Sequence, residues 1–66
     1  MIDLTRLNST VFSINPDLIE IVESTPDTVV TLTTGRKIIV KETRQEVKNL
    51  VLSYRKKVYS GLLKID

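Results

Sequence analysis

The sequence predicts an α+β protein in which a small antiparallel β-sheet of four to five short strands is followed by one C-terminal α-helix. Two observations carry this prediction. Over about residues 2–41, short apolar and β-branched runs alternate with turn-forming residues, which is typical of strands and hairpins. Over about residues 44–60, apolar residues recur with the period of a helix. A chain of 66 residues is expected to form one domain, residues 1–66.

The first strands are expected over residues 2–7 and 11–14, with a turn at residues 8–9 between them. Asn15-Pro16-Asp17 predicts the next turn, because proline fixes φ while Asn and Asp side chains bond their own backbone. A third strand is expected over residues 18–23.

The remaining strands form a predicted hairpin. The turn over residues 24–27 has the same chemistry as the preceding one, and residues 28–33 are rich in β-branched side chains that fit a pleated surface. Gly35 tolerates positive φ and allows the chain to reverse. Residues 36–41 are then expected to form the last strand.

The helix is predicted to begin at a capping box. In Thr43-Arg44-Gln45-Glu46, the Thr hydroxyl and the Glu carboxylate are each expected to bond the other residue's backbone N–H. Gly61 is expected to weaken the helix and to end it before Leu62. At 100° per residue, one apolar stripe contains Val47, Leu50, Val51, Tyr54, Val58, Leu62 and Ile65.

Alternation along the strands divides their apolar residues between two faces. The expected core face carries Ile2, Leu4, Phe12, Ile14, Ile19, Ile21, Val30, Leu32, Ile38 and Val40. The other face carries Leu7, Val11, Leu18, Val22, Val29 and Ile39, and the helix has a second stripe of Leu52, Tyr59 and Leu63. One helix covers one face, so the surplus indicates an interaction surface; the simpler interpretation is ordinary scattered exposure.

A chain this short is expected to draw no more than about 3–5 kcal/mol from its core. The sequence has neither cysteine nor histidine, which excludes a stabilising disulfide and the commonest metal ligand. We therefore expect self-association, as a homo-oligomer. No signal peptide and no apolar run of about 20 residues is visible, so the expected location is the cytoplasm.

Charge is distributed unevenly along the chain. Residues 1–34 hold one basic and five acidic residues, whereas residues 35–66 hold nine basic and three acidic residues, for a net charge of +2. The cations of the helix fit either a solvated face near a helix C-terminus or a surface for an anionic partner. The candidate partner-binding residues are Arg55, Lys56 and Lys57 for an acidic partner, with Leu52 and Tyr59 for an apolar contact.

The sequence offers no candidate catalytic, cofactor-binding or metal-binding residues. Asp17, Glu20 and Glu23 lie near one another, but a turn and the two faces of a strand explain them better than cation binding or acid–base chemistry. No histidine is present to activate a Ser or Thr nucleophile. A non-enzymatic protein without cofactor or small-molecule substrate is therefore expected.

Several segments together resemble the FlbD/SwrD family of bacterial flagellar motility proteins. They are residues 2–8, residues 15–20, and residues 25–37 followed by Val40-Lys41-Glu42, in matching order over about residues 2–58. The sequence departs from the family pattern at Ser9, where Gly is usual, and at Thr34, where Asn is common. The segment from Tyr59 onward is less typical of the family.

The resemblance implies a cytoplasmic accessory protein at the flagellar base, near the membrane, which supports swimming or swarming torque through contact with the stator. It implies no catalytic or cofactor residues. The alternative is a small dimeric β-sheet regulator that binds RNA, because Leu4-Thr5-Arg6 is similar to the first strand of the carbon-storage regulator family. That similarity covers three residues, so nucleic acid is the less favoured partner.

Overall fold

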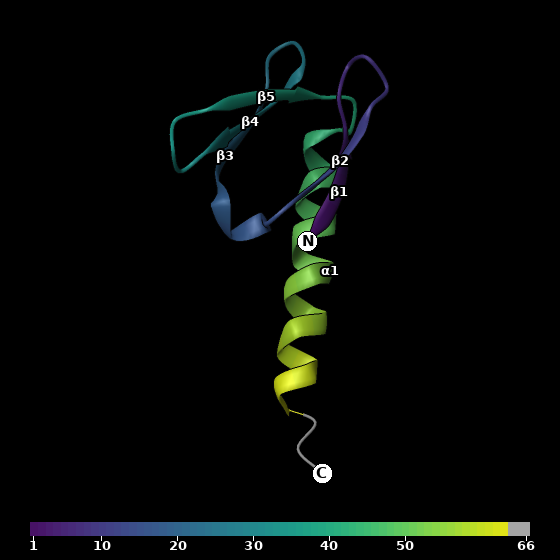
Figure 1. The fold of residues 1–66 in the computed structure, drawn as a ribbon, viewed down its shortest axis with the longest axis vertical. Helices are drawn as coiled ribbons and strands as arrows, with labels where there is room; N and C mark the ends of the chain where they lie inside the picture. The colour runs from purple at the N-terminus through teal and green to yellow at the C-terminus, as the bar shows by residue number, and fades with distance from the viewer. Residues whose placement is uncertain (64–66) are drawn as a thin grey trace.

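Five strands and one long helix make up the fold in the computed structural model, which describes residues 1–63 and their side chains as far as Ser60. The elements are β1 (Ile2–Thr5), β2 (Val11–Ile14), the 3-10 helix η1 (Pro16–Leu18), β3 (Ile19–Ser24), β4 (Thr28–Leu32), β5 (Lys37–Val40) and α1 (Arg44–Leu63). Figure 1 shows the strands gathered around the first half of α1, while its second half extends away from them. The predicted α+β class is confirmed.

The strands form two antiparallel sheets where the sequence predicted one. Strands β1 and β2 make a hairpin, and β3, β4 and β5 make a three-stranded sheet in that order. The hairpin meets β5 only at their ends, through a bridge between Arg6 and Val40 and a 2.8 Å hydrogen bond from the Lys41 N–H to the Thr5 carbonyl. Because so little of β1 pairs with β5, the hairpin diverges from the sheet and packs in front of α1 (Figure 1).

The core lies between the hairpin, the three-stranded sheet and the first turns of α1. Leu4, Val30 and Val47 are fully buried at its centre. The remaining buried apolar residues are Ile2, Ile14, Ile38 and Val40, and partly buried neighbours include Phe12, Leu32, Leu50, Val51 and Tyr54. Most residues of the predicted core face therefore do face the core.

A bulge in β3 makes the predicted face assignment wrong for two residues. Ile19 pairs with Leu32 and Ile21 with Thr31, so Glu20 is an extra residue in β3 with no partner in β4. An extra residue reverses the alternation of side chains that follow it. Ile21, expected in the core, is therefore 47% exposed, and Val22, expected outside, packs against the core.

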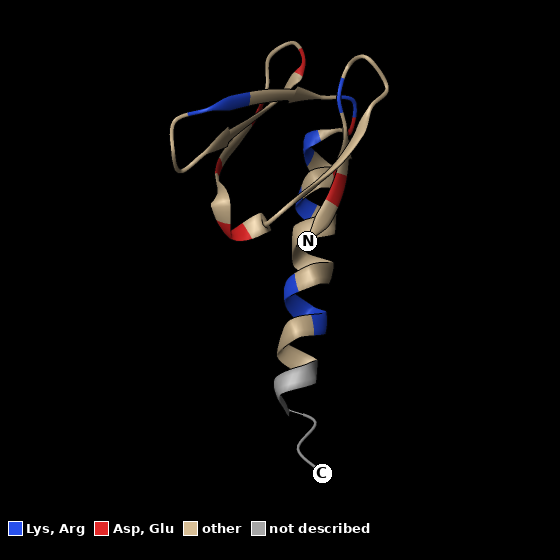
Figure 2. Ribbon diagram, viewed as in Figure 1, with Lys and Arg blue, Asp and Glu red and all other residues tan. Residues whose placement is uncertain are grey.

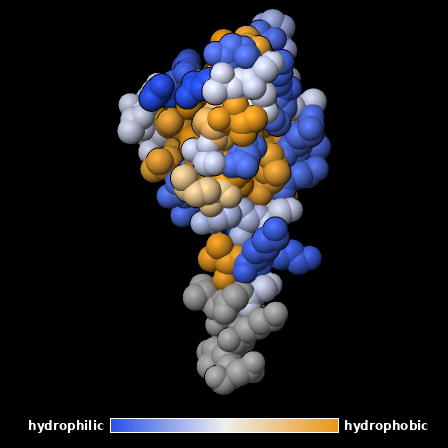
Figure 3. Space-filling model, turned by 45° about the vertical axis from the view of Figure 1, so that its right-hand side comes forward, coloured by the Kyte–Doolittle hydropathy of each residue, from blue (hydrophilic) through white to orange (hydrophobic). Residues whose placement is uncertain are grey.

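The predicted surplus of apolar surface is present. Of the residues assigned to the outer face, Leu7, Val11, Leu18 and Ile39 are all exposed, while Val29 is half-buried. Only Val11, Val29 and Ile39 of these lie in strands, because Leu7 follows β1 and Leu18 ends η1. Figure 3 shows such apolar patches separated by hydrophilic side chains on one face of the molecule. The exposed apolar surface is thus divided among several small patches.

Helix α1 begins as predicted and continues further than predicted. The Glu46 N–H donates to the Thr43 hydroxyl at 3.0 Å, and the Thr43 N–H donates to the Glu46 carboxylate at 3.2 Å, which is the capping box. Gly61 does not end the helix, which reaches Leu63, because one glycine costs only about 1 kcal/mol relative to alanine.

The second half of α1 extends beyond the core. Val58 lies on the same stripe as Val47, yet it is 47% exposed. The radius of gyration is 13.0 Å, whereas a compact chain of this length has about 11 Å. The predicted stripe positions Leu62, Leu63 and Ile65 lie outside the residues whose side chains are described.

The turns follow the expected local chemistry. The Asn15 side chain accepts a 3.0 Å hydrogen bond from the Asp17 N–H and so caps η1. Gly35 has φ of +90° in the turn between β4 and β5. Ser9 has φ of +71° in the turn between β1 and β2, a conformation that costs a non-glycine residue about 1–2 kcal/mol.

Candidate protein-binding groove

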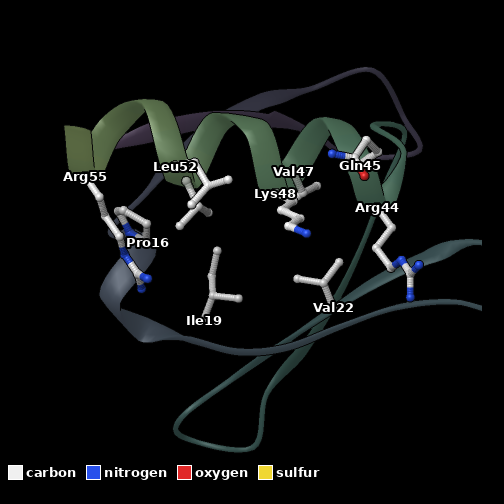
Figure 4. A pocket seen from close by; sticks show the side chains of 10 residues that line it. Pro16, Ile19, Val22, Arg44, Gln45, Val47, Lys48, Leu52 and Arg55 are labelled. Atoms are coloured by element: carbon white, nitrogen blue, oxygen red, sulfur yellow. The ribbon is translucent and has the colours of Figure 1, made fainter. Parts of the chain in front are cut away.

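An open groove runs between α1 and β3, with a volume of about 510 Å³. Its wall on the helix side comes from α1, and its other wall comes from η1 and β3 (Figure 4). The lining residues are Pro16, Ile19, Val22, Arg44, Gln45, Val47, Lys48, Val51, Leu52 and Arg55. None of them belongs to β4 or β5, so the groove follows the β3 edge of the sheet.

The apolar floor of the groove depends on the bulge in β3. Residues three apart in a regular strand point to opposite faces, but the extra residue Glu20 places Ile19 and Val22 on the same side. Figure 4 shows both side chains pointing from β3 toward α1. Both are half-buried, so the chain itself covers these two floor side chains only in part, whereas Pro16 beside them is fully buried.

The helix contributes three cations to the rim of the groove. At about 100° per residue, Arg44, Lys48 and Arg55 lie within about 40° of one another around the helix axis, so they share one face. Arg44 and Arg55 lie at opposite ends of the groove in Figure 4, with Lys48 between them. All three side chains are exposed. The groove thus joins an apolar floor to a positively charged rim.

The structure brings together only some of the predicted partner-binding residues. Leu52, which is 52% exposed, and Arg55 both line the groove. Tyr59 lies next to Arg55 in an adjoining hollow of about 380 Å³, which Asp17, Tyr54 and Val58 also line. Leu52, Arg55 and Tyr59 therefore form one continuous strip along the helix.

Lys56 and Lys57 do not line this groove. Consecutive helical residues are about 100° apart, so the run Arg55-Lys56-Lys57 spreads around the helix and cannot form one patch. Figure 2 shows the cations recurring along α1 in separate places. The sequence analysis did not single out Arg44 and Lys48. Lys48 follows Arg44 by four residues and precedes Arg55 by seven, and this spacing indicates a common face.

A carboxylate holds the start of α1 against the N-terminal hairpin. Glu42 accepts one 2.8 Å hydrogen bond from the Thr5 N–H and another from the Thr5 hydroxyl. Burial raises the pKa of Glu42, but the hydrogen bonds from Thr5 outweigh that effect and hold the pKa below its ordinary value of 4.5. Because Glu42 precedes the capping box directly, these bonds fix where α1 leaves the strands and so help to set the groove.

Other chemistry is sparse in the described part of the chain. Among residues 1–63, no three His, Cys, Asp or Glu side chains gather in a way that could hold a metal ion. Within the same residues, no helix is sufficiently long and apolar to cross a membrane.

These features define a small α+β protein with a partly covered core and a basic, apolar-floored groove beside its end strand. The chain belongs to the FlbD family of flagellar and swarming motility proteins, whose model matches residues 1–59. The resemblance that the sequence segments indicated is thus confirmed over nearly the whole chain. No curated protein and no solved structure matches it.

Proposed function

We propose that this chain is a non-enzymatic accessory protein of the flagellar motor, which supports swimming or swarming torque by binding the stator at the cytoplasmic side of the motor. Membership of a motility family supports the pathway. The groove supports the mode of action, because an apolar floor with a charged rim is the usual composition of a protein-binding surface. The floor is the observation that carries the proposal: Ile19, Val22 and Leu52 leave apolar area uncovered at one place.

A deletion strain tests this role. We expect reduced swimming speed in viscous medium and reduced swarming, while the number and length of filaments stay normal, because torque is affected and assembly is not. Tethered-cell rotation measures the torque directly. Normal torque in the deletion strain, or loss of the filaments themselves, would contradict the proposal.

We also propose that the chain self-associates, which accounts for the exposed patches on the outer face of the strands. Val11 and Ile39 are exposed there, as is Leu7 in the turn after β1, and a lone core of this size supplies only about 3–5 kcal/mol. Light scattering on the purified protein measures the mass. A monomer at all concentrations up to the millimolar range would remove this part of the proposal.

RNA binding has less support. Single-stranded RNA is usually held on exposed aromatic side chains, but the Arg6 guanidinium lies 4.5 Å from the centre of the Phe12 ring, and Tyr54 is half-buried. Only Tyr59 is well exposed, at 65%. A gel shift at low and moderate salt separates the two functions, because RNA binding would weaken steeply as salt rises.

A further inference from the structure

We infer that the groove between α1 and β3 binds an extended segment of a partner protein that carries apolar side chains flanked by Asp or Glu. This inference rests on the proposed function, because it describes the partner of the same surface. It adds the conformation, the approximate length and the charge of the bound segment.

The charge of the segment follows from the rim. Arg44, Lys48 and Arg55 are exposed cations along one side of the groove, and no acidic side chain is among the lining residues. Arg and Lys donate strong hydrogen bonds to carboxylates, so an acidic segment gains contacts here that a neutral or basic segment does not. Complementary charge of this kind increases the rate of encounter and disfavours the wrong partners.

The length of the segment follows from the length of the groove. The stretch of α1 from Arg44 to Arg55, both of which line the groove, is about 16 Å long at 1.5 Å per residue. At about 3.3 Å per residue, roughly five extended residues span it.

The extended conformation of the segment follows from the position of the groove, which lies beside the end strand β3. Strand β3 is at the end of its sheet and pairs only with β4 among the described residues. An end strand offers backbone N–H and C=O groups to an added strand, while pockets beside it accept alternate side chains. Ile19 and Val22 line the groove next to this edge, so apolar side chains of the segment have a floor to cover.

Peptide binding followed by NMR tests the inference. The probes are three labelled peptides of about nine residues: one alternating Glu with Val or Leu, one in which Lys replaces every Glu, and one that keeps the acidic sequence but methylates alternate backbone nitrogens. We expect submillimolar binding of the acidic peptide, with amide shifts concentrated in residues 16–24 and 44–55. We expect at least tenfold weaker binding of the other two, since one has the wrong charge and the other lacks strand-pairing donors.

A matched pair of variants locates the site. Lys48→Glu with Arg55→Glu reverses two cations of the rim, whereas Lys56→Glu with Lys57→Glu makes the same charge change on the same helix outside the groove. All four side chains are exposed, so both variants are expected to fold, as their amide spectra will check. The rim variant should bind the acidic peptide at least tenfold more weakly than wild type, and the control should stay within about threefold.

Several outcomes would overturn the inference. It is wrong if the acidic peptide does not bind at 1 mM, if the basic peptide binds equally well, or if the two double variants lose binding equally. It is also wrong if methylation of the backbone has no effect, which would show that the segment does not pair with β3, if circular dichroism shows that the acidic peptide becomes helical when bound, or if the rim variant alone disperses a dimer, which would indicate a second copy. The motor role is judged separately by torque in the deletion strain, so either proposal can fail while the other stands.

Discussion

Replacement of Glu42 by alanine is the most direct test of how the hairpin and the start of α1 are held together. The change removes two 2.8 Å hydrogen bonds from Thr5 to a carboxylate. Buried hydrogen bonds to charged groups contribute about 1.5–3 kcal/mol each. Glu42 is half-buried and water competes for it, so we take about 1 kcal/mol for each bond and expect a loss of about 2 kcal/mol.

Urea denaturation followed by far-UV circular dichroism measures this loss. With a slope of about 1 kcal/mol per molar urea for a small protein, the midpoint of unfolding should fall by about 2 M. The matched control is Glu23→Ala, which removes an exposed carboxylate from β3 and is expected to change stability by less than about 0.5 kcal/mol. Equal effects of the two substitutions would refute the role assigned to Glu42.

The pH dependence gives an independent check on the same bonds. The folded-state pKa of Glu42 lies below its ordinary value of 4.5, so its contribution to stability is fully present above that value. The contribution is lost as the pH falls through the folded-state pKa, because the protonated carboxyl accepts hydrogen bonds poorly. Glu42→Gln should therefore be less stable than wild type at pH 6, and this difference should shrink as the pH falls below 4.5 through the folded-state pKa. A stability difference that stays unchanged over this fall in pH would contradict the reasoning.

Four further substitutions test three local features by urea denaturation. Val22→Thr should lower the free energy of unfolding by about 1 kcal/mol, while Ile21→Thr should change it by less than about 0.5 kcal/mol. A larger loss for Ile21→Thr than for Val22→Thr would refute the bulge. Thr43→Ala should cost about 1 kcal/mol through loss of the cap, and an unchanged midpoint would show that the capping box contributes nothing. Ser9→Gly should raise stability by about 0.5 kcal/mol, because relief of the positive φ exceeds the greater entropy of glycine in the unfolded chain; a lower midpoint would contradict this balance.

The parts of the fold that the sequence predicts are those set by neighbouring residues. The capping box at Thr43 needs only Glu46 three residues later, and the turn at Asn15 needs only the backbone of Asp17. Gly35 has the positive φ that its position in the hairpin requires. In each case, sequence order alone brings the interacting groups together.

The sequence did not predict the bulge in β3, because a bulge is defined by the pairing of two strands and not by neighbouring residues. Glu20 becomes an extra residue only when β3 pairs with β4, and unbroken alternation from Ile19 assigns Ile21, not Val22, to the core. Because the bulge was not predicted, Ile19 and Val22 were not expected to lie on the same side of β3, where they form the floor of the groove. The division into two sheets is similar, since it depends on how far β1 can pair with β5.

Two of the three rim cations, Arg44 and Lys48, were missed for a different reason, whereas Arg55 was among the predicted partner-binding residues. The run of cations at residues 55–57 is conspicuous in the sequence, but residues adjacent in sequence point in different directions around a helix. The shared face of Arg44, Lys48 and Arg55 follows from spacing alone. Positions at intervals of three and four residues are therefore a better guide to a helical binding surface than a cluster of charges.

Because the core is small and the groove is open, a segment bound in the groove would stabilise the folded state. Ile19, Val22 and Val51 pack against the core yet remain only partly covered, so the apolar layer is incomplete on the side where a partner segment would lie. A ligand that binds only the folded state stabilises it by about 2.7 kcal/mol at a concentration one hundred times its Kd. That gain is comparable to the whole 3–5 kcal/mol or so that a core of this size supplies alone. Occupation of the groove would therefore stabilise a cysteine-free chain of this length by an amount close to what its own core supplies.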